Sequence, residues 1–502
     1  MRVGAENPKS GMSDAKTAVG ASPSDLPRVL VLSDEVPQTV NAGAILLYRL
    51  FAGYGQDAQG ERGQPEPVHC ERGHCNILKK EHVTKLFVVG PKAHANAALL
   101  NCSYRELRMP LRRLETSRFS MHKRSLQALG LIPLPSHRKV LRLLGSFRPE
   151  VIVCVMQNTP FMCLAERTAR RLGVPLVLIV HDLNEEFEKV YPWAKKALFA
   201  TNCRVYRSAA RRLCVSPEMA EYLEKRYGVP GEVMYPNRSE ELQTRAAELS
   251  LTLRAAADQK TKRPKDQKTE NIPNTESLGA TDSLPATSNP LQASAALTLG
   301  YAGSLAYGYG EELVKLIDVL REVGARIRMF SPKPSGILDA LNHATDVVEI
   351  CGYRPALEAW GEIQQTCDAV ILPYSNPAGK YESLYRTHFP SKLTEYLALG
   401  MPVIVSGPEF ATGVKWAQGA DQEVRGEEPE FEKDYVDVVK IAPNGAVPCV
   451  SREELVSLLN ALKHDGALRS EAAKRAVSAG ARNFDPARIR KAYWATLKEV
   501  AA

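Results

Sequence analysis

The stretch 387-THFPSKLTEYLALGMPVIVSG-407 decides the fold, because it runs from a short amphipathic helix directly into a buried strand. Pro390 suits the first turn of a helix, since its missing N–H would have no partner there. Apolar residues recur at helical spacing from Leu393, and Gly400 supplies a C-terminal stop. The run 402–405 (PVIV) is typical of a strand that is buried on both faces. The stretch therefore predicts a helix packed on a mostly parallel sheet.

Two polar side chains of this helix, Lys392 and Glu395, stand three positions apart and so share one face. Lys392 is nearer to the positive, N-terminal end of the helix dipole. A cation and a carboxylate in this arrangement could hold an anion and a polyhydroxy group. The alternative is an exposed ion pair, which would contribute little to stability.

The rest of the chain repeats the alternation of strand and helix. Apolar runs predict strands in both halves, at 28–33, 86–90, 151–156, 175–181 and 212–216, and at 297–303, 326–332, 347–353, 369–375 and 402–407. Helical patterns lie between them and close the chain, at 452–464, 467–480 and 486–500. This order predicts an α/β protein with two doubly wound Rossmann-like domains and a cleft at the carboxyl ends of their strands.

Changes in composition divide the 502 residues into five segments. Segments poor in large apolar side chains cannot bury enough surface to fold, so we expect them to be disordered. The predicted segments are a disordered leader (1–26), an N-terminal domain (27–238), a low-complexity linker (239–296), a C-terminal domain (297–485) and a C-terminal helix that packs back on the N-terminal domain (486–502). We also expect a surface insertion at 55–82 and a less regular acidic stretch at 417–437.

The composition is that of an ordinary globular protein, with 44% hydrophobic and 24% charged residues and a net charge of +8. No apolar run is long enough to span a membrane, and the N-terminus lacks the apolar core of a signal peptide. Ten cysteines, mostly in apolar runs, indicate reduced thiols and a cytoplasmic protein. The run His69-Cys70 to His74-Cys75 has no second ligand pair at zinc-site spacing, so we interpret it as an exposed loop.

Two loops at the ends of strands are candidates for chemistry. Gly303 and Ser304 follow the first strand of the second half, in GYAGSLAYGYGEEL, where small residues let backbone N–H groups approach a phosphate. His181 follows the strand 175–180, and we expect it to face the cleft with Asp182 orienting it. Tight turns without a ligand are the alternative for the glycine loop, and a helix cap is the alternative for Asp182.

A basic run extends from Arg105 to Arg148 with only two acidic residues inside it. Leu, Phe and Met are interleaved with the cations, a pattern that suits an anionic membrane surface or an anionic acceptor. A solvated helix face is the alternative, and no nucleic-acid module accompanies the charge. We assign to this acceptor or membrane side Asn41, Arg112, Arg113, Arg118, Lys123 and Arg124.

These motifs together resemble glycosyltransferases of the GT-B fold, and specifically glycosyltransferase family 4. The resemblance covers most of residues 27–500 and rests on SDEVPQTVNAG (33–43), VSPEMAEYLEKRYGV (215–229), the glycine loop and, most specifically, FPSKLTEYLALGMPVIVSG. It implies a nucleotide sugar on the C-terminal half, an acceptor on the N-terminal half, and retention of configuration. It also implies that Glu395 holds the ribose, Gly43 lies near the diphosphate and His181 contacts the transferred sugar.

Two departures from the family pattern affect the donor site. The first of two glutamates, eight positions apart, is replaced by Thr387, and only Glu395 remains. The usual Arg and Lys after the first C-terminal strand fall on Ser304 and Tyr309. A leaving phosphate needs a cation, so we assign that role to Lys392, with Lys380 and Arg386 as alternatives. The predicted catalytic residues are His181 and Lys392, and the predicted donor residues are Gly43, Gly303, Ser304, Tyr374, Thr387, Ser391, Lys392 and Glu395.

The predicted function is transfer of a hexose from a nucleotide sugar to a sugar, glycan, lipid-linked or small-molecule acceptor, without a cofactor. No Asp-x-Asp triplet occurs in the chain, so we expect no metal. The alternatives are a sugar-nucleotide epimerase or phosphorylase of the same fold, and a sugar-binding or scaffolding protein that has lost catalysis. The location that we expect is cytoplasmic, with peripheral contact to the inner face of the membrane.

Overall fold

The computed structural model describes residues 25–39, 42–55, 85–94, 97–109, 119–132, 135–183, 190–244, 296–419 and 446–502. The predicted leader, insertion, linker and acidic stretch lie almost entirely outside these residues and stay predictions. Asn41, Arg112, Arg113, Arg118 and the run His69 to Cys75 also lie outside the described residues.

Two parallel sheets form the framework. The first has seven strands in the order β3-β2-β1-β4-β5-β6-β7, and the second has six in the order β10-β9-β8-β11-β12-β13. Every strand pairing is parallel. Both sheets therefore contain the Rossmann order, in which the direction of winding reverses beside the first strand of each half. The predicted fold class is confirmed.

The central strands are short and buried on both faces, as parallel sheets covered by helices require. Their bounds are β1 Val29–Leu32, β2 Leu86–Gly90, β3 Ser103–Glu106, β4 Val151–Val155, β5 Leu176–Val180, β6 Arg211–Cys214 and β7 Glu232–Val233 in the first sheet, and β8 Thr298–Ala302, β9 Arg326–Phe330, β10 Val348–Ile350, β11 Ala369–Pro373, β12 Val403–Ser406 and β13 Ala446–Cys449 in the second. The edge strands β3, β7 and β13 were not predicted, because they are short and carry polar residues or proline.

Helices cover both faces of each sheet. Those of the first half are α1 Ala42–Phe51, α2 Ser120–Ala128, α3 His137–Leu144, α4 Thr159–Leu172, α6 Pro192–Ser208 and α7 Pro217–Tyr227. Those of the second half are α9 Tyr309–Val323, α10 Ala340–His343, α11 Ala356–Thr366, α12 Glu382–Thr387, α13 Ser391–Tyr396, α14 Thr412–Ala417, α15 Arg452–His464, α16 Gly466–Asn483 and α17 Pro486–Ala501, with 3-10 turns at Gly336–Leu338 and Gly379–Tyr381. The helix predicted from the opening stretch is α13, which ends at Tyr396 and not at Gly400.

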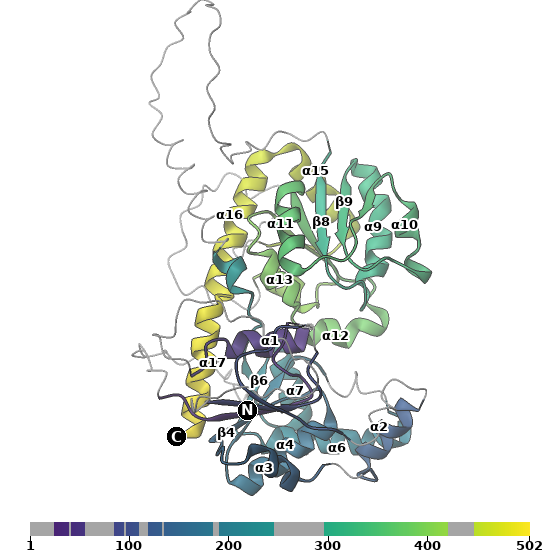
Figure 1. The fold of residues 1–502 in the computed structure, drawn as a ribbon. Helices are drawn as coiled ribbons and strands as arrows, with labels where there is room; N and C mark the ends of the chain where they lie inside the picture. Colours follow the sequence, from purple (N-terminus) through teal and green to yellow (C-terminus); the bar gives the residue numbers. More distant parts are fainter. Residues whose placement is uncertain are drawn as a thin grey trace, which may run out of the picture.

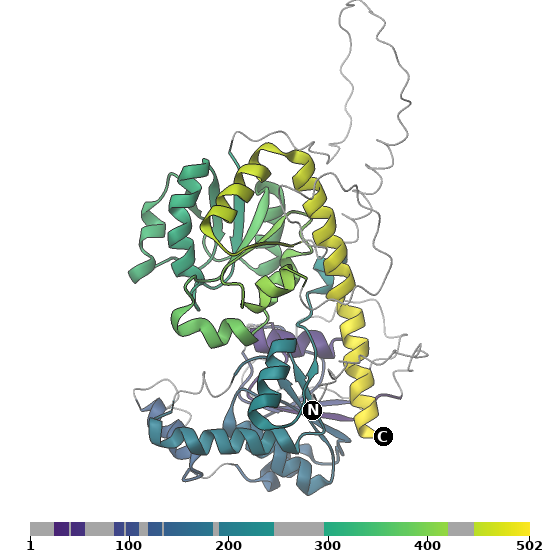
Figure 2. The ribbon, with the colours of Figure 1, turned by 180° about the vertical axis from the view of Figure 1, so that it is seen from behind.

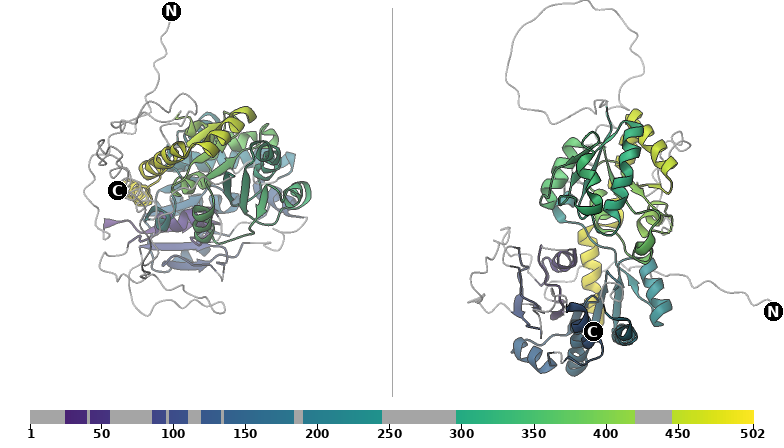
Figure 3. Two further views of the ribbon diagram at one scale, coloured as in Figure 1. Left: turned by 90° about the horizontal axis from the view of Figure 1, so that it is seen from above. Right: turned by 90° about the vertical axis from the view of Figure 1, so that its right-hand side faces the viewer.

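The two halves form two lobes that meet at α1, α7 and α12 (Figure 1). After α16 the chain leaves the second lobe, and α17 runs along the first lobe, as the view from behind shows (Figure 2). The views from above and from the side show the same arrangement, with the C-terminus beside the first lobe (Figure 3). Tyr493 and Leu497 of α17 enter the core of the first lobe beside Leu47 and Leu50 of α1. The last helix therefore belongs structurally to the N-terminal half.

Candidate functional site

The carboxyl ends of the central strands of both sheets lead into the space where the lobes meet. Ser33 to Glu35 follow β1, His181 and Asp182 follow β5, and the glycine loop 303–308 follows β8. The stretch 387–396, which contains α13, contacts the first lobe at Ser216, Asp182 and Arg49. In sheets of this topology ligands bind at this edge, outside the strand that reverses the order.

Lys392 points from α13 into the glycine loop. Its Nζ donates hydrogen bonds to Tyr301 Oη at 2.7 Å and to the carbonyl of Ser304 at 3.2 Å. The ammonium also lies 4.5 Å and 4.3 Å from the ring centroids of Tyr301 and Tyr309. Among the described residues it forms no ion pair with a carboxylate, and burial lowers the pKa of Lys392 to about 7. Such an ammonium is stabilised by a ligand that brings negative charge.

Two glycines of the loop 303–308 leave space for the side chain of Lys392 and for its neighbours. Gly303 has a φ of 125°, and a Cβ there would lie 2.5 Å from Lys392 Cε. Gly308 has a φ of 86° and is the N-cap residue of α9, where a Cβ would collide with Tyr385 Oη. Tyr385 in turn donates to the carbonyl of Tyr307 at 2.6 Å, which fixes the loop. Only glycine fits these two positions, so the predicted loop is a constrained cradle for Lys392.

The helix ends that face this loop contribute less positive charge than the sequence indicated. α13 has only six residues, too few for a substantial dipole. The first turn of α9 carries Glu311 and Glu312, which offset the positive end of that helix. Lys392 is therefore the main positive charge beside the loop in the part of the chain that the structure describes.

Glu395 faces the other lobe. Its Oε1 accepts a hydrogen bond from Arg49 Nη2 of α1 at 2.7 Å, and Arg49 Nη1 also donates to the carbonyl of Asn237 at 2.8 Å. Both side chains of the ion pair are largely buried, at 18% and 13% exposure. Lys392 and Glu395 thus do not pair with each other, and the exposed ion pair considered as an alternative is not formed.

His181 and Asp182 lie at the interface between the lobes. Asp182 Oδ2 is 3.3 Å from His181 Nε2, and its Oδ1 is 3.1 Å from His388 Nε2 on the other lobe. Burial acts to raise the pKa of Asp182, but the two histidines outweigh it and hold the pKa below its usual value. The Nδ1 atom of His181 is buried and has no hydrogen-bond partner among the described residues. One ring nitrogen of His181 is thus engaged by Asp182, and the other is buried and unpaired in the part of the chain that the structure describes.

Two of the predicted donor residues, Tyr374 and Thr387, are buried. Tyr374 packs between Tyr309 and Tyr385, with ring centroids 5.9 Å and 4.8 Å away. Thr387 is also buried; its Oγ1 donates to Ser383 and its carbonyl accepts from Ser216 of the first lobe at 2.6 Å. Their part in donor binding stays a prediction.

The other predicted donor residues and the two alternative cations lie at or near the surface of the cleft or beside other side chains, as follows. Ser304 and Ser391 are exposed at the site. Gly43 lies close to Glu35, since a Cβ at Gly43 would be 3.1 Å from its carboxyl group. Lys380 lies over the Tyr381 ring, and Arg386 pairs with Glu382, so neither alternative cation enters the glycine loop. Lys392 is the one of the three that does.

On the predicted acceptor or membrane side, Lys123 is buried at 3% exposure and Arg124 is half-buried. Lys123 therefore belongs to no exposed basic face. None of the helices in the described ranges is long and apolar enough to cross a bilayer. The described residues also contain no cluster of three or more His, Cys, Asp or Glu that could hold a metal ion.

Sequence reasoning missed the residues that come from distant segments. Arg49 is an ordinary helical arginine in the sequence, and nothing in its surroundings signals Glu395. His388 stands beside Thr387, but its contact with Asp182 depends on how the lobes meet. The three tyrosines of the glycine loop were visible in GYAGSLAYGYG, and the alternation of glycine and tyrosine was the available signal.

Comparisons with known proteins agree with this architecture. Residues 82–237 match the model of the glycosyl transferase 4-like domain. The chain resembles Anabaena Alr3699/HepE in complex with UDP-glucose, at 13% identity and a TM-score of 0.52, over 94% of this chain and 99% of that chain. It resembles a glycosyltransferase from Rickettsia africae ESF-5 at 10% identity and a TM-score of 0.52, over 94% and 97% of the two chains.

A third similar structure is the catalytic domain of starch synthase IV from Arabidopsis thaliana bound to ADP and acarbose, at 11% identity and a TM-score of 0.53, over 95% and 99% of the two chains. No curated protein sequence matches this chain. At these identities the structural likeness establishes the fold. The resemblance to GT-B glycosyltransferases with a family 4-like domain is confirmed.

Proposed function

We propose that this GT-B chain, whose residues 82–237 are a glycosyl transferase 4-like domain, transfers a hexose from a nucleotide sugar to an acceptor held by the first lobe. The observation that carries the proposal is the ammonium of Lys392, enclosed by the glycine loop and two tyrosine rings without a carboxylate partner among the described residues. The diphosphate of a nucleotide sugar supplies the missing negative charge.

The proposed reaction breaks the bond between the anomeric carbon and the diphosphate oxygen, and the electron pair leaves with the diphosphate. The acceptor hydroxyl forms the new bond to that carbon, and its proton passes to the departing diphosphate. Negative charge grows on the diphosphate in the transition state, so an ammonium beside it lowers the barrier. Lys392 thereby takes the place of the family's Arg and Lys, and we infer a metal-independent reaction with retention of configuration.

The other roles follow from position. His181 offers its Nδ1 atom to the transferred sugar, and Asp182 orients the ring from the Nε2 side. Glu395 holds the ribose, while Arg49 fixes its carboxylate through one oxygen. Removing Glu395 should therefore mainly weaken donor binding, since ribose contacts are made in the ground state and the transition state alike.

The acceptor side and the location are also part of the proposal. We place the acceptor, a sugar, a glycan or a lipid-linked molecule, against the first lobe on the His181 side of the cleft. The eight cysteines among the described residues are all free thiols, in keeping with a reducing, cytoplasmic compartment.

The test is release of nucleoside diphosphate from a panel of nucleotide sugars, with Lys392→Ala and Lys380→Ala compared. We expect turnover with at least one donor, and a loss of about a hundredfold in turnover for Lys392→Ala with folding intact. Lys380 lies outside the loop, so Lys380→Ala serves as the matched control and should keep wild-type turnover. Donor binding without release from any nucleotide sugar would favour the alternative of a sugar-binding protein that has lost catalysis.

A further inference from the structure

Five large apolar side chains of the first lobe are exposed to solvent instead of packing in its core. Phe119, Leu126, Leu129, Leu131 and Trp193 are exposed at 46%, 37%, 43%, 66% and 55%, and we call this set the α2–α6 patch. Phe119, Leu126 and Leu129 are spaced so that they share one side of α2. Large apolar side chains gathered in this way mark a surface that meets a membrane or another molecule.

The patch is continuous between the two helices. The ring of Phe119 is 6.3 Å from that of His122, His122 is 4.7 Å from Tyr191, and Tyr191 stacks on Trp193 at 5.8 Å. α2 packs directly on α6. A run of touching rings thus joins the exposed side of α2 to the start of α6.

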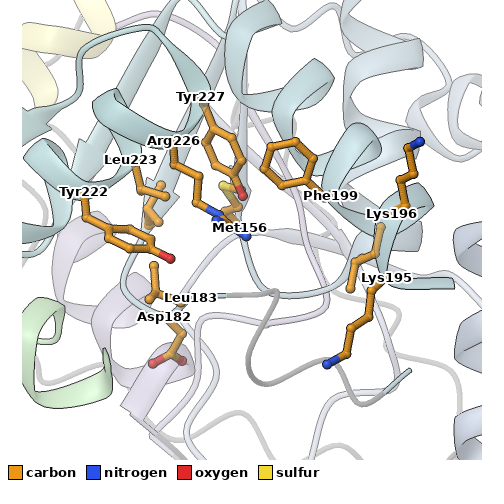
Figure 4. A pocket seen from close by; sticks show the side chains of 12 residues that line it. Met156, Asp182, Leu183, Lys195, Lys196, Phe199, Tyr222, Leu223, Arg226 and Tyr227 are labelled. Carbon is orange, nitrogen blue, oxygen red and sulfur yellow. The ribbon is translucent and has the colours of Figure 1, made fainter. Parts of the chain in front are cut away.

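The same start of α6 forms the wall of a pocket. Lys195, Lys196 and Phe199 of α6 line a cavity of ≈ 370 Å³ together with Tyr222 and Arg226 of α7, and Asp182 stands at its edge. Figure 4 shows the Arg226 guanidinium between Tyr222 and Tyr227, and Lys195 and Lys196 extending in opposite directions. Lys195 extends toward the side on which Asp182 lies, and Lys196 extends away from it.

The described charges of this pocket are mainly positive. Arg226 stacks on Phe199 and Tyr222, with centroid distances of 4.9 Å and 5.8 Å, which holds its guanidinium beside the cavity. Asp182 is the acidic side chain of the lining, and it is engaged by His181 and His388. The aromatic rings provide apolar faces that suit a sugar ring or an alkyl chain.

We propose that the acceptor is an anionic amphiphile presented by a membrane, with its charged, hydroxyl-bearing head in this pocket and its apolar part toward the α2–α6 patch. The proposal rests on the proposed function and names its substrate class. Three features support it: the patch is apolar, cations stand two and three residues beyond Trp193, and the Asp182 end of the pocket adjoins His181 in the cleft. Arg and Lys at an apolar surface favour anionic lipid headgroups.

The first experiment measures binding of the full chain to phosphatidylcholine vesicles with and without phosphatidylglycerol. We expect binding to the anionic vesicles, weakening as salt is raised. The variant Phe119→Ser/Leu131→Ser should bind these vesicles at least about tenfold more weakly than the wild type. The matched control is Ile337→Ser/Tyr353→Ser, which removes apolar side chains of the second lobe that are even more exposed and should bind as the wild type.

A partner protein or a second copy of the chain would also cover an apolar patch. Analytical ultracentrifugation of the same variants distinguishes this outcome. A dimer that is lost in Phe119→Ser/Leu131→Ser, with vesicle binding unchanged or absent, would overturn the membrane proposal.

The second experiment tests the pocket with soluble probes that need no donor: octyl glucoside, octyl glucuronide and octyl glucoside 6-phosphate, titrated calorimetrically at low concentration. We expect at least one anionic probe to bind about tenfold more tightly than the neutral one. Arg226→Gln and Lys195→Gln should abolish that preference. Lys225→Gln, at an exposed lysine of α7 that does not line the pocket, should keep it. The two anionic probes distinguish a carboxylate from a phosphate head. Equal binding of all three probes, or no binding of any, would overturn the proposal.

The alternative role for Arg226 and Lys195 is to form ion pairs within the chain. Glu185, Glu186 and Glu188 follow Asp182 closely in the sequence and lie outside the described residues. If Arg226 and Lys195 served only to pair with them, the glutamine variants would lower the melting temperature and leave the probe preference unchanged. Failure of the proposed function gives a different result. The chain would then release no nucleoside diphosphate but would still bind the anionic probes more tightly than the neutral one.

Discussion

At the scale of single residues, the proposed site centres on Lys392, whose ammonium group is shielded from water. Lys392 is placed against two tyrosine rings and a carbonyl, and burial lowers its pKa to about 7. An ammonium in this setting is poised between its two protonation states near neutral pH. A bound diphosphate would shift that balance toward the charged form.

Proton uptake on ligand binding tests this directly. Above pH 7 the free site holds a largely neutral Lys392, so binding the nucleoside diphosphate that the panel identifies should draw in a proton at pH 8 and much less at pH 6. Calorimetry in buffers of different ionisation enthalpy measures the uptake. Lys392→Met should abolish it and Lys380→Met should not; equal uptake in all three proteins would contradict the assignment.

The lowered pKa of Lys392 also predicts how the free energy of unfolding changes with pH. The folded state disfavours the charged form, so between about pH 7 and the ordinary lysine range the unfolded chain binds more protons. The contribution of Lys392 to the free energy of unfolding therefore rises with pH across that window. Lys392→Met should flatten this part of the profile.

At the scale of elements, the position of Lys392 is constrained more by the loop between β8 and α9 than by the helix that carries the residue. The loop has the backbone angles that only glycine adopts easily, and it leaves room for the lysine stem at Gly303. α13 is short and ends before the predicted stop, and its Lys392 and Glu395 bond to different lobes.

Substituting the glycine tests the loop. Gly303→Ala should cost about 1–2 kcal/mol of stability for its positive φ and, in addition, displace Lys392 and weaken donor binding about tenfold or more. Gly336→Ala is the matched control, with a φ of 61° and no atom within 4 Å of the position that its Cβ would take. It should share the loss of stability and keep donor affinity. Unchanged donor affinity in Gly303→Ala would mean that the loop does not position Lys392.

At the scale of the whole molecule, the C-terminal helix ties the lobes together. α17 extends the second half of the chain onto the first lobe, where Trp494 Nε1 donates to the carbonyl of Leu50 at 2.8 Å. Tyr493 is buried beside Phe51, with centroids 5.4 Å apart, and its hydroxyl finds no partner among the described residues. The first lobe thus depends on residues that the chain supplies last.

Two substitutions at Tyr493 separate packing from polarity. Tyr493→Ala should lower the free energy of unfolding by about 3–5 kcal/mol, because it opens a cavity in the first lobe. Tyr493→Phe removes only an unpaired buried hydroxyl and should be neutral or stabilising by up to about 1 kcal/mol. Denaturant melts measure both. A Phe variant as damaging as the Ala variant would show that the hydroxyl is in fact paired.

The sequence by itself determined the two Rossmann-like halves, because their strands are continuous apolar runs and periodicity is a local property that each segment carries on its own. It also indicated Lys392, from its place in the helix of the opening stretch, and the glycine loop, from its residue types after a strand. That the two meet was not visible in the sequence. Edge strands such as β3 and β13 escaped, because strands that are short, polar or interrupted by proline lack that signal.

Only the tertiary structure decided which residues meet. The pairing of Arg49 with Glu395 and of Asp182 with His388 joins segments that are hundreds of positions apart, and the burial of Tyr374, Thr387 and Lys123 depends on what packs over them. Neither property is encoded in local spacing. The α2–α6 patch is the converse case, since apolar side chains that a sequence pattern would assign to the core are left exposed where no other element of the described chain covers them.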